Sequence, residues 1–215
     1  IVLHRDLFGE QILDAGCDCG VMSVFLAQTF PGSQVTAIDR CPEGLGIGRH
    51  LADRLGLSNI VFKNESVSDA EGMYDTVFSM RTLQENRMDD DRIPVFWPLQ
   101  KQVDDYYKAV LREYAGALTK PLLSGGHLVC IERCTADPLL LAFWNLLDEN
   151  GCVVKTNTPE FISCMEAGEK TDLLGFAAKR RGADVSGAVF VRHCGGTDDE
   201  DGGNRLCGGV SGPGG

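Results

Sequence analysis

The stretch QILDAGCDCG, residues 11–20, decides which fold this chain adopts. Its opening run, QILDAG, is mostly apolar and predicts a buried strand. Gly16 and Gly20 follow, and glycine at such a turn permits a positive φ and lets a ligand approach the backbone closely. Residues 21–30 (VMSVFLAQTF) predict a helix, which the Pro31-Gly32 pair stops. The stretch therefore predicts a strand, a glycine-containing turn and a helix, in that order.

Short strand-like runs alternate with longer helical segments along the rest of the chain. Strands are expected at 33–39, 59–64, 74–80 and 127–133, with weaker candidates at 152–156 and 172–180. Helices are expected at 42–56, 99–118 and 137–150, and the Gly125-Gly126 pair is expected to break the chain before the fifth strand. Such alternation predicts an α/β protein with a mostly parallel sheet that carries helices on both faces.

The bulk composition excludes several classes of protein. The chain of 215 residues has 20 Lys and Arg against 31 Asp and Glu, and its formal net charge of −11 repels phosphate backbones, which disfavours nucleic acid as a partner. No uninterrupted apolar run reaches the roughly 18 residues that a membrane span needs, and no secretory signal is visible. The nine cysteines are an odd number scattered through apolar runs, which favours reduced thiols and a cytoplasmic protein.

The end of the chain differs from the rest. Residues 195–215 are rich in glycine and acids and carry too little apolar surface to order themselves. Just before them, residues 187–193 (GAVFVRH) are a candidate for an extra edge strand. We therefore expect one domain over residues 1–181, followed by an extra segment and a partly disordered tail over 182–215.

Polar residues follow each of the first four predicted strands. Ligands of open parallel sheets bind outside the carboxyl ends of the strands, where these residues gather. Asp39 ends the second strand, and its two carboxylate oxygens can accept from both hydroxyls of a ribose. Glu65, after the third strand, can accept from an exocyclic amine such as that of adenine. The other candidates in these loops are Asp14, Asp18, Ser66, Ser79, Met80 and Arg81.

The order and spacing of these motifs resemble the class I S-adenosylmethionine-dependent methyltransferases. The first motif of that family matches Asp14-x-Gly16-x-x-x-Gly20, and its acid at the end of the second strand matches Asp39. The acid and small residue after the third strand match Glu65-Ser66. The strand opening with Asp matches 74–80, and the double glycine before the fifth strand matches 125–126, so the resemblance covers about residues 9–180.

The resemblance implies a fold, a cofactor and a reaction. The fold would be a three-layer α/β/α Rossmann-like sandwich with a seven-stranded, mostly parallel sheet, and the reaction would transfer a methyl group from S-adenosyl-L-methionine to an O, N or C nucleophile of a small molecule. The main chain at Gly16 and Gly20 would hold the methionine part of the cofactor, Asp39 the ribose and Glu65 the adenine amine. The full set of expected cofactor residues is Asp14, Gly16, Cys17, Asp18, Gly20, Asp39, Arg40, Glu65, Ser66 and Ser79.

Asp18 is the chief departure from the family pattern, because it stands where the middle glycine of the first motif usually is. Asp tolerates the left-handed backbone conformation better than most residues. Its carboxylate would either repel the carboxylate of the cofactor or hold its ammonium group. The alternative to an enzyme is therefore a catalytically silent domain of the same fold that serves as a binding or interaction module.

The acceptor pocket is expected after the fourth and fifth strands, from Met80, Arg81, Phe96, Trp97 and Glu132. No catalytic base is predicted, although His4 lies in a segment that such enzymes often use as a lid. Methyl transfer can proceed by placing the nucleophile in line with the methyl group, which needs no base. The stretch SMRTLQEN after the fourth strand lacks the Pro-rich tetrapeptide of the enzymes that methylate nucleic-acid bases.

Two other ligands fit the first motif less well. Cys17, Cys19 and Cys41 can be interpreted as soft-metal ligands, but a structural zinc site normally takes four ligands at looser spacing, so no metal is predicted. A dinucleotide requires G-x-G-x-x-G, and the spacing from Gly16 to Gly20 does not fit that pattern.

Overall fold

The computed structural model describes residues 1–85, 105–132, 138–166 and 169–182. The chain divides into two units, Ile1–Asp184 and Val185–Gly215, and all described residues lie in the first. The expected pocket residues Phe96 and Trp97, the candidate edge strand at 187–193 and most of the expected tail lie outside the described residues.

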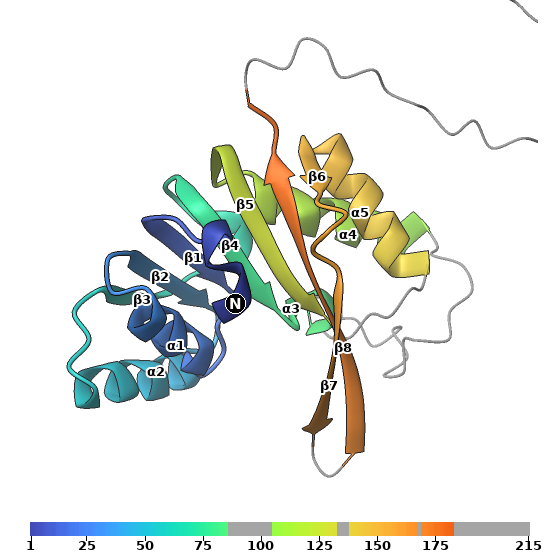
Figure 1. Cartoon of the computed structure of the whole chain (residues 1–215). Helices are drawn as coiled ribbons and strands as arrows, with labels where there is room; N and C mark the ends of the chain where they lie inside the picture. Colours follow the sequence, from blue (N-terminus) through green and yellow to red (C-terminus); the bar gives the residue numbers. More distant parts are fainter. Residues whose placement is uncertain (86–104, 133–137, 167–168, 183–215) are drawn as a thin grey trace, which may run out of the picture. The chain divides into compact units, whose positions relative to one another are not determined.

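A single twisted sheet forms the centre of the first unit (Figure 1). Its strand order is β3-β2-β1-β4-β5-β8-β6, and β7 pairs with β8 beside this path. Strands β1 to β5 run parallel, whereas β8 is antiparallel to β5, β6 and β7. The strands are β1 (Gln11–Ala15), β2 (Gln34–Asp39), β3 (Ile60–Asn64), β4 (Tyr74–Met80), β5 (Leu122–Glu132), β6 (Cys152–Val154), β7 (Glu160–Glu166) and β8 (Glu169–Arg180).

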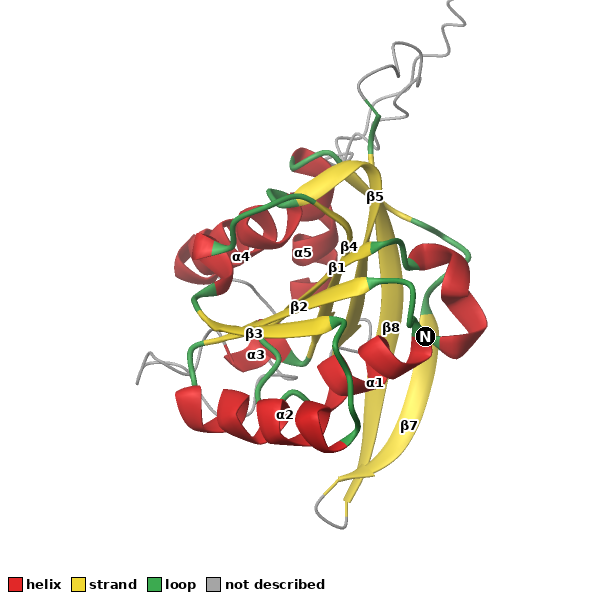
Figure 2. Ribbon diagram, turned by 90° about the vertical axis from the view of Figure 1, so that its left-hand side faces the viewer, coloured by secondary structure: helices red, strands yellow, loops and turns green. Residues whose placement is uncertain are grey.

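Helices cover both faces of this sheet, as Figure 2 shows. Helices α1 (Val21–Thr29) and α2 (Pro42–Arg54) lie on one face, with the 3-10 helix η1 (Val2–Leu7). Helices α4 (Asp105–Thr119) and α5 (Pro138–Glu149) lie on the other. The short α3 (Thr82–Glu85) follows β4, and the 3-10 helix η2 (Val67–Asp69) follows β3. The predicted three-layer, mostly parallel α/β/α sandwich is confirmed.

Each central strand contributes side chains to both apolar cores, because successive residues of a strand point to opposite faces. Ile12 and Phe78 belong to the core on the α1 face, and Leu13 and Val77 belong to the core on the α4 face. All four side chains are fully buried. This burial on both faces explains why these strands read as nearly continuous apolar runs in the sequence.

The sheet differs from the sequence expectation at two places. Strand β5 begins at Leu122, so the Gly125-Gly126 pair lies inside it and does not break the chain. The pairing with β4 shifts register between Tyr74 and Thr76, and Gly125 has a φ of 80°, as expected of a β-bulge. Strand β7 was not expected; it pairs with the first half of β8 and makes the sheet eight-stranded rather than seven-stranded.

None of the helices in the described ranges combines the length and the apolar content needed to cross a membrane.

Candidate functional site

The turn after β1 has three residues in the left-handed region. Gly16, Asp18 and Gly20 have φ values of 77°, 49° and 70°. A Cβ atom on Gly16 would lie 2.4 Å from Cγ2 of Thr82, so glycine is required there by space as well as by φ. Asp18 is one of the few non-glycine types that adopt this conformation readily, and its side chain is exposed. The sequence expectation for the backbone of Asp18 agrees with the structure.

Helix α2 holds this turn from the side. A Cβ on Gly44 would lie 2.8 Å from the carbonyl oxygen of Asp18, and one on Gly48 would lie 2.6 Å from the Phe62 ring and 3.2 Å from the carbonyl oxygen of Cys19. The helix begins at Pro42, and the Sγ atom of Cys41 accepts a hydrogen bond from the N–H of Gly44 at 3.5 Å. The two buried glycines therefore allow the first turns of α2 to lie directly against the loop.

The Asp39 carboxylate connects the turn to α2. Its Oδ2 accepts from the backbone N–H of Asp18 at 2.9 Å, and its Oδ1 accepts from the backbone N–H of Cys41 at 2.8 Å. A carboxylate offers about four acceptor positions, so each oxygen retains capacity for a further donor such as a ribose hydroxyl. Asp39 thus fixes the geometry of the site and remains able to bind a ligand.

A cavity of about 100 Å³ opens at this carboxyl edge of the sheet. Five of the ten expected cofactor residues line it, together with two that the sequence did not indicate. The lining residues are Gly16, Asp39, Arg40, Glu65, Ser66, Val67 and Thr82. Val67 and Thr82 each lie within three residues of a strand end or an expected site residue. This proximity was the only feature of the sequence that could have predicted them as lining residues.

Glu65 lines this cavity and carries an acceptor atom without a partner among the described residues. Its backbone N–H donates to the carbonyl oxygen of Asp39 at 3.1 Å, and its Oε1 lies 3.9 Å from Nζ of Lys63. Its other oxygen, Oε2, is buried and has no hydrogen-bond partner among the described residues. Buried polar atoms are nearly always paired, so this oxygen suits a ligand donor such as an exocyclic amine.

Asp14 is placed differently from the expectation, because it does not line the cavity. It is 1 % exposed, and its Oδ2 accepts from the Ser23 hydroxyl at 2.5 Å. Burial raises the pKa of this carboxyl to about 7, against the lowering effect of the Ser23 hydrogen bond and with a smaller contribution from the charge of Asp39. Asp14 therefore connects β1 to α1 beneath the site.

The three expected residues with cysteine or serine side chains also differ in their positions. Cys17 is buried beside Ala37 and Leu45, and burial raises the pKa of its thiol well above the usual range. Ser66 lines the cavity, but Ser79 is fully buried and its hydroxyl contacts Thr82 and Tyr114 instead. In the described part of the chain, no group of three His, Cys, Asp or Glu residues is arranged to hold a metal ion.

The described candidates for the acceptor pocket do not line this cavity either. Met80 packs against the core on the α1 face, and Glu132 is fully buried at the end of β5. Arg81 has a φ of 62°, and its backbone N–H donates to the carbonyl oxygen of Ile131 at 2.8 Å. The expected residues that line the cavity therefore follow β1, β2 and β3, whereas the three described candidates at the ends of β4 and β5 do not line it.

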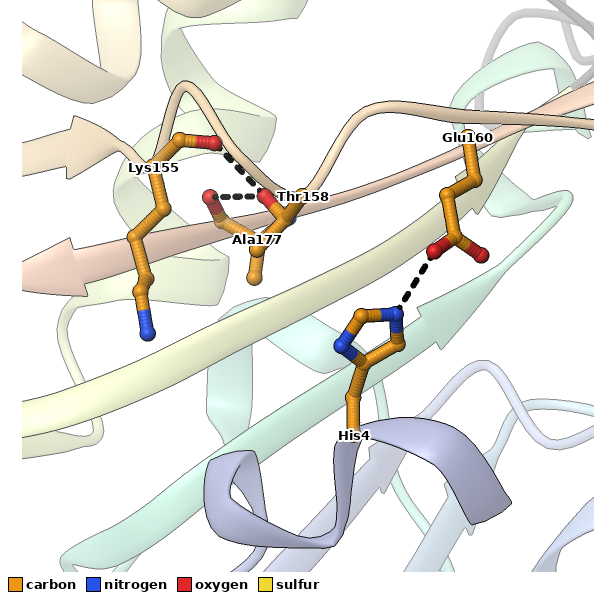
Figure 3. A network of polar contacts seen from close by, with 5 residues as sticks. All are labelled: His4, Lys155, Thr158, Glu160 and Ala177. Carbon is orange, nitrogen blue, oxygen red and sulfur yellow. Dashed lines mark hydrogen bonds and ion pairs between the residues drawn. The ribbon is translucent and has the colours of Figure 1, made fainter.

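A second cavity of about 50 Å³ lies among η1, β5 and β8, and it shares no lining residue with the first. His4 lines this second cavity, and its Nε2 lies 2.8 Å from Oε1 of Glu160 (Figure 3). Nearby, the Thr158 hydroxyl donates to the carbonyl oxygen of Lys155 at 2.7 Å and accepts from the N–H of Ala177 at 2.9 Å. His4 therefore connects the amino-terminal segment to β7 rather than covering the first cavity.

The sequence of the chain matches a family model and parts of curated proteins. The sequence model of a family described as a methyltransferase domain matches residues 8–149. The chain is 37% identical over 83 residues to the ubiquinone biosynthesis O-methyltransferase of Methylocella silvestris, covering 37% of this chain and 31% of that protein. It is 36% identical over 75 residues to the malonyl-[acyl-carrier protein] O-methyltransferase of Acetivibrio thermocellus, covering 34% of this chain and 25% of that protein. The chain thus matches only a minor part of the length of these curated relatives.

Solved structures share the fold at low sequence identity. A SAM-dependent methyltransferase from Methanosarcina mazei superposes with a TM-score of 0.62 at 16% identity, covering 84% of this chain and 97% of that one. The N-methyltransferase NodS from Bradyrhizobium japonicum, in complex with S-adenosyl-L-homocysteine, gives a TM-score of 0.57 at 19% identity, covering 83% of each chain. These likenesses establish the fold of the chain.

Proposed function

The chain belongs to the methyltransferase domain family, and on that premise we propose that it transfers a methyl group from S-adenosyl-L-methionine to a small molecule. The observation that carries the proposal is the cavity at the carboxyl edge of the sheet, where Asp39 and Glu65 present acceptor atoms beside the glycine turn. When bound, the cofactor supplies the electrophilic methyl group.

The strand order divides the residues that line the cavity into two groups, one at each end of the cavity. Asp39 and Glu65 follow β2 and β3, and they would take the ribose hydroxyls and the adenine amine. Gly16 and Thr82 follow β1 and β4, and the bare backbone of Gly16 would let the amino-acid part of the cofactor approach. The chain's own contribution to the reaction is then to bind the cofactor and to orient its methyl group toward the acceptor.

We further propose an oxygen atom as the acceptor, ahead of the nitrogen and carbon alternatives. The two curated relatives named above are O-methyltransferases, and this is the support for oxygen. The net charge of −11 supports a small molecule over a nucleic acid. A cytoplasmic location is proposed from the free thiols of the described cysteines Cys17, Cys19, Cys41, Cys130 and Cys152.

Asp18 does not require the catalytically silent alternative. Its backbone adopts the conformation that the turn needs, its N–H holds Asp39 in place, and its carboxylate is exposed. We therefore retain the enzyme as the proposal for the whole site.

Titration calorimetry with S-adenosylmethionine and S-adenosylhomocysteine tests the proposal. At about 100 μM protein, where even weak binding gives heat, both ligands are expected to bind one site per chain. The Asp39→Ala variant loses a charge-assisted hydrogen bond to the ribose and also the link between the turn and α2. It should weaken binding by about 1.5–3 kcal/mol, whereas Asp53→Ala, an exposed acid on α2, should bind like the parent. No heat with either ligand would refute the proposed function, and full affinity in Asp39→Ala would refute the placement of the ribose.

A further inference from the structure

Three hydroxyl groups meet in the protein interior behind the cavity. The hydroxyl of Ser79 on β4 lies 2.5 Å from that of Thr82 on α3 and 2.9 Å from that of Tyr114 on α4, and the Thr82 and Tyr114 hydroxyls also contact each other. The three residues are 0 %, 5 % and 5 % exposed. Each hydroxyl can donate one hydrogen bond and accept others, so the three groups can satisfy one another without water.

Thr82 connects this cluster to the glycine turn. Its Oγ1 belongs to the hydroxyl cluster, whereas its Cγ2 lies against Gly16, where an added Cβ would come within 2.4 Å. Thr82 also lines the cavity. The hydroxyl and the methyl group of threonine are both attached to Cβ, so one χ1 angle sets the direction of both, and the hydrogen bonds of the hydroxyl fix where the methyl group lies. The hydroxyl cluster therefore determines where the methyl group of Thr82 contacts the glycine turn.

Tyr114 is the fixed member of the cluster. Its ring stacks on Phe143 of α5 with centroids 6.1 Å apart, within the core on the α4 face. Burial, and secondarily the negative charge of Glu132, raises the pKa of its phenol well above 10. The phenol therefore stays protonated, and so able to donate a hydrogen bond, at every physiological pH.

We propose that Tyr114, acting through Thr82, is a positioning residue for the end of the cofactor site that takes the amino-acid part. This inference rests on the proposed function. Because the strand order is β3-β2-β1-β4, Gly16 and Thr82 lie on the opposite side of the cavity from Glu65. A change at Tyr114 should therefore reach the amino-acid part of the ligand and leave the adenosine part unaffected.

The Tyr114→Phe variant removes the hydroxyl and keeps the ring. Its affinity is measured by calorimetry for S-adenosylhomocysteine and for 5′-methylthioadenosine, which lacks the amino-acid part. Affinity for S-adenosylhomocysteine should fall about three- to tenfold, the scale of one hydrogen bond, and affinity for methylthioadenosine should stay unchanged. Tyr74→Phe is the matched control, because Tyr74 is also buried and its hydroxyl donates to the carbonyl oxygen of Glu71 at 3.0 Å, outside the cavity lining.

A double-mutant cycle tests the route through Thr82. Thr82→Val keeps the branched shape and loses the hydroxyl, so it should weaken S-adenosylhomocysteine binding as Tyr114→Phe does. The combined variant should be little weaker than either single one, since both remove the same coupling. Equal losses for both ligands in Tyr114→Phe, no loss at all, or additive losses in the double variant would each overturn the inference.

Hydrogen exchange separates this inference from the proposed function, because it needs no ligand. The N–H groups of Gly16 and Cys17 both donate to the carbonyl oxygen of Ile38 at 3.0 Å, and that of Gly20 donates to the carbonyl oxygen of Cys17 at 2.8 Å. These amides should exchange faster in Tyr114→Phe and Thr82→Val than in the parent and in Tyr74→Phe. If the protein binds no cofactor, the proposed function is refuted, and faster exchange in these variants would then show only that the hydroxyl cluster stabilises the turn. Unchanged exchange would refute the positioning role.

Discussion

Glu65 is a single residue whose missing hydrogen-bond partner, within the described part of the chain, points to a role in ligand binding. Glu65 lines the cavity; one of its oxygens faces Lys63, while the other is buried without a partner among the described residues. An unpaired buried acceptor costs stability unless a ligand satisfies it. The arrangement is therefore better explained by binding than by folding.

Glu65→Gln should change which base the site prefers. The neutral amide loses the charged acceptor for an amine but gains a donor, so affinity for S-adenosylhomocysteine should fall about tenfold or more. S-inosylhomocysteine carries a carbonyl where adenine carries its amine, and its affinity for the variant should rise relative to the parent. Calorimetry with both ligands measures this, with the exposed acid Glu71→Gln as control. A parallel loss for both ligands would mean that Glu65 does not contact the base.

Asp14 should make the stability of the protein depend on pH. Its pKa is raised to about 7 in the folded protein and takes the ordinary value near 3.8 in the unfolded chain. Between these values only the folded state keeps the proton. The contribution of Asp14 to the free energy of unfolding is therefore full below about pH 4. It falls by up to about 1.4 kcal/mol per pH unit as the pH rises and is lost above about pH 7.

Urea unfolding of the parent and of Asp14→Asn between pH 4.5 and 8 measures this effect. The variant has no charge to bury and keeps an acceptor for Ser23. Its free energy of unfolding should therefore rise relative to that of the parent as the pH increases. The exposed Asp53→Asn should follow the parent at every pH. A difference between Asp14→Asn and the parent that is the same across this range would contradict the buried, protonated state.

At the scale of elements, the first turns of helix α2 pack against the turn after β1 and help to shape it. Gly44 and Gly48 are buried against the turn after β1 and against Phe62, whereas Gly46 has open space around it and faces solvent. The three glycines share a helix and a spacing of two residues, so they differ chiefly in what lies beside them.

Gly44→Ala and Gly46→Ala should therefore have opposite effects. An added methyl at Gly44 would lie 2.8 Å from a backbone oxygen of the turn, which must shift, so both stability and affinity for S-adenosylhomocysteine should fall. Gly46→Ala should gain about 0.5–1 kcal/mol of stability from helix propensity and keep its affinity. Urea unfolding and calorimetry measure the two quantities. Equal behaviour of the two variants would show that the close approach of α2 does not shape the site.

The whole molecule places the site through its strand order. The strand order reverses at β1, with β2 and β3 on one side of it and β4 and β5 on the other, so the loops that follow these parallel strands meet at one edge although they are distant in sequence. The described helices and strands all lie within residues 1–182, and we propose that this part forms the domain.

A chain ending at residue 182 should therefore unfold at the same temperature as the full chain and bind S-adenosylhomocysteine equally well. A chain ending at residue 168 is the contrasting variant, because it lacks β8, which pairs with β5, β6 and β7. That shorter chain should fail to fold cooperatively. A lower melting temperature or weaker binding in the chain ending at 182 would show that the removed residues contribute to the domain.

The sequence by itself determined the order of the strands and helices except for α3 and β7, together with the glycine turn and the acids Asp39 and Glu65 at the strand ends. These features depend on apolar runs and on turn residues, whose effects extend over only a few positions. Residues at strand ends could be assigned to the site because parallel strands bring their carboxyl ends to one edge.

Only the tertiary structure decided which of these side chains reach the cavity. The two-residue period of a strand places Asp14 on the face of Ile12, against α1, and Ser79 on the face of Val77, against Tyr114 of α4. Both side chains are therefore buried beneath the site, while Thr82 lines the cavity. Which helix covers each face depends on contacts between residues far apart in the chain, and no local pattern contains that information.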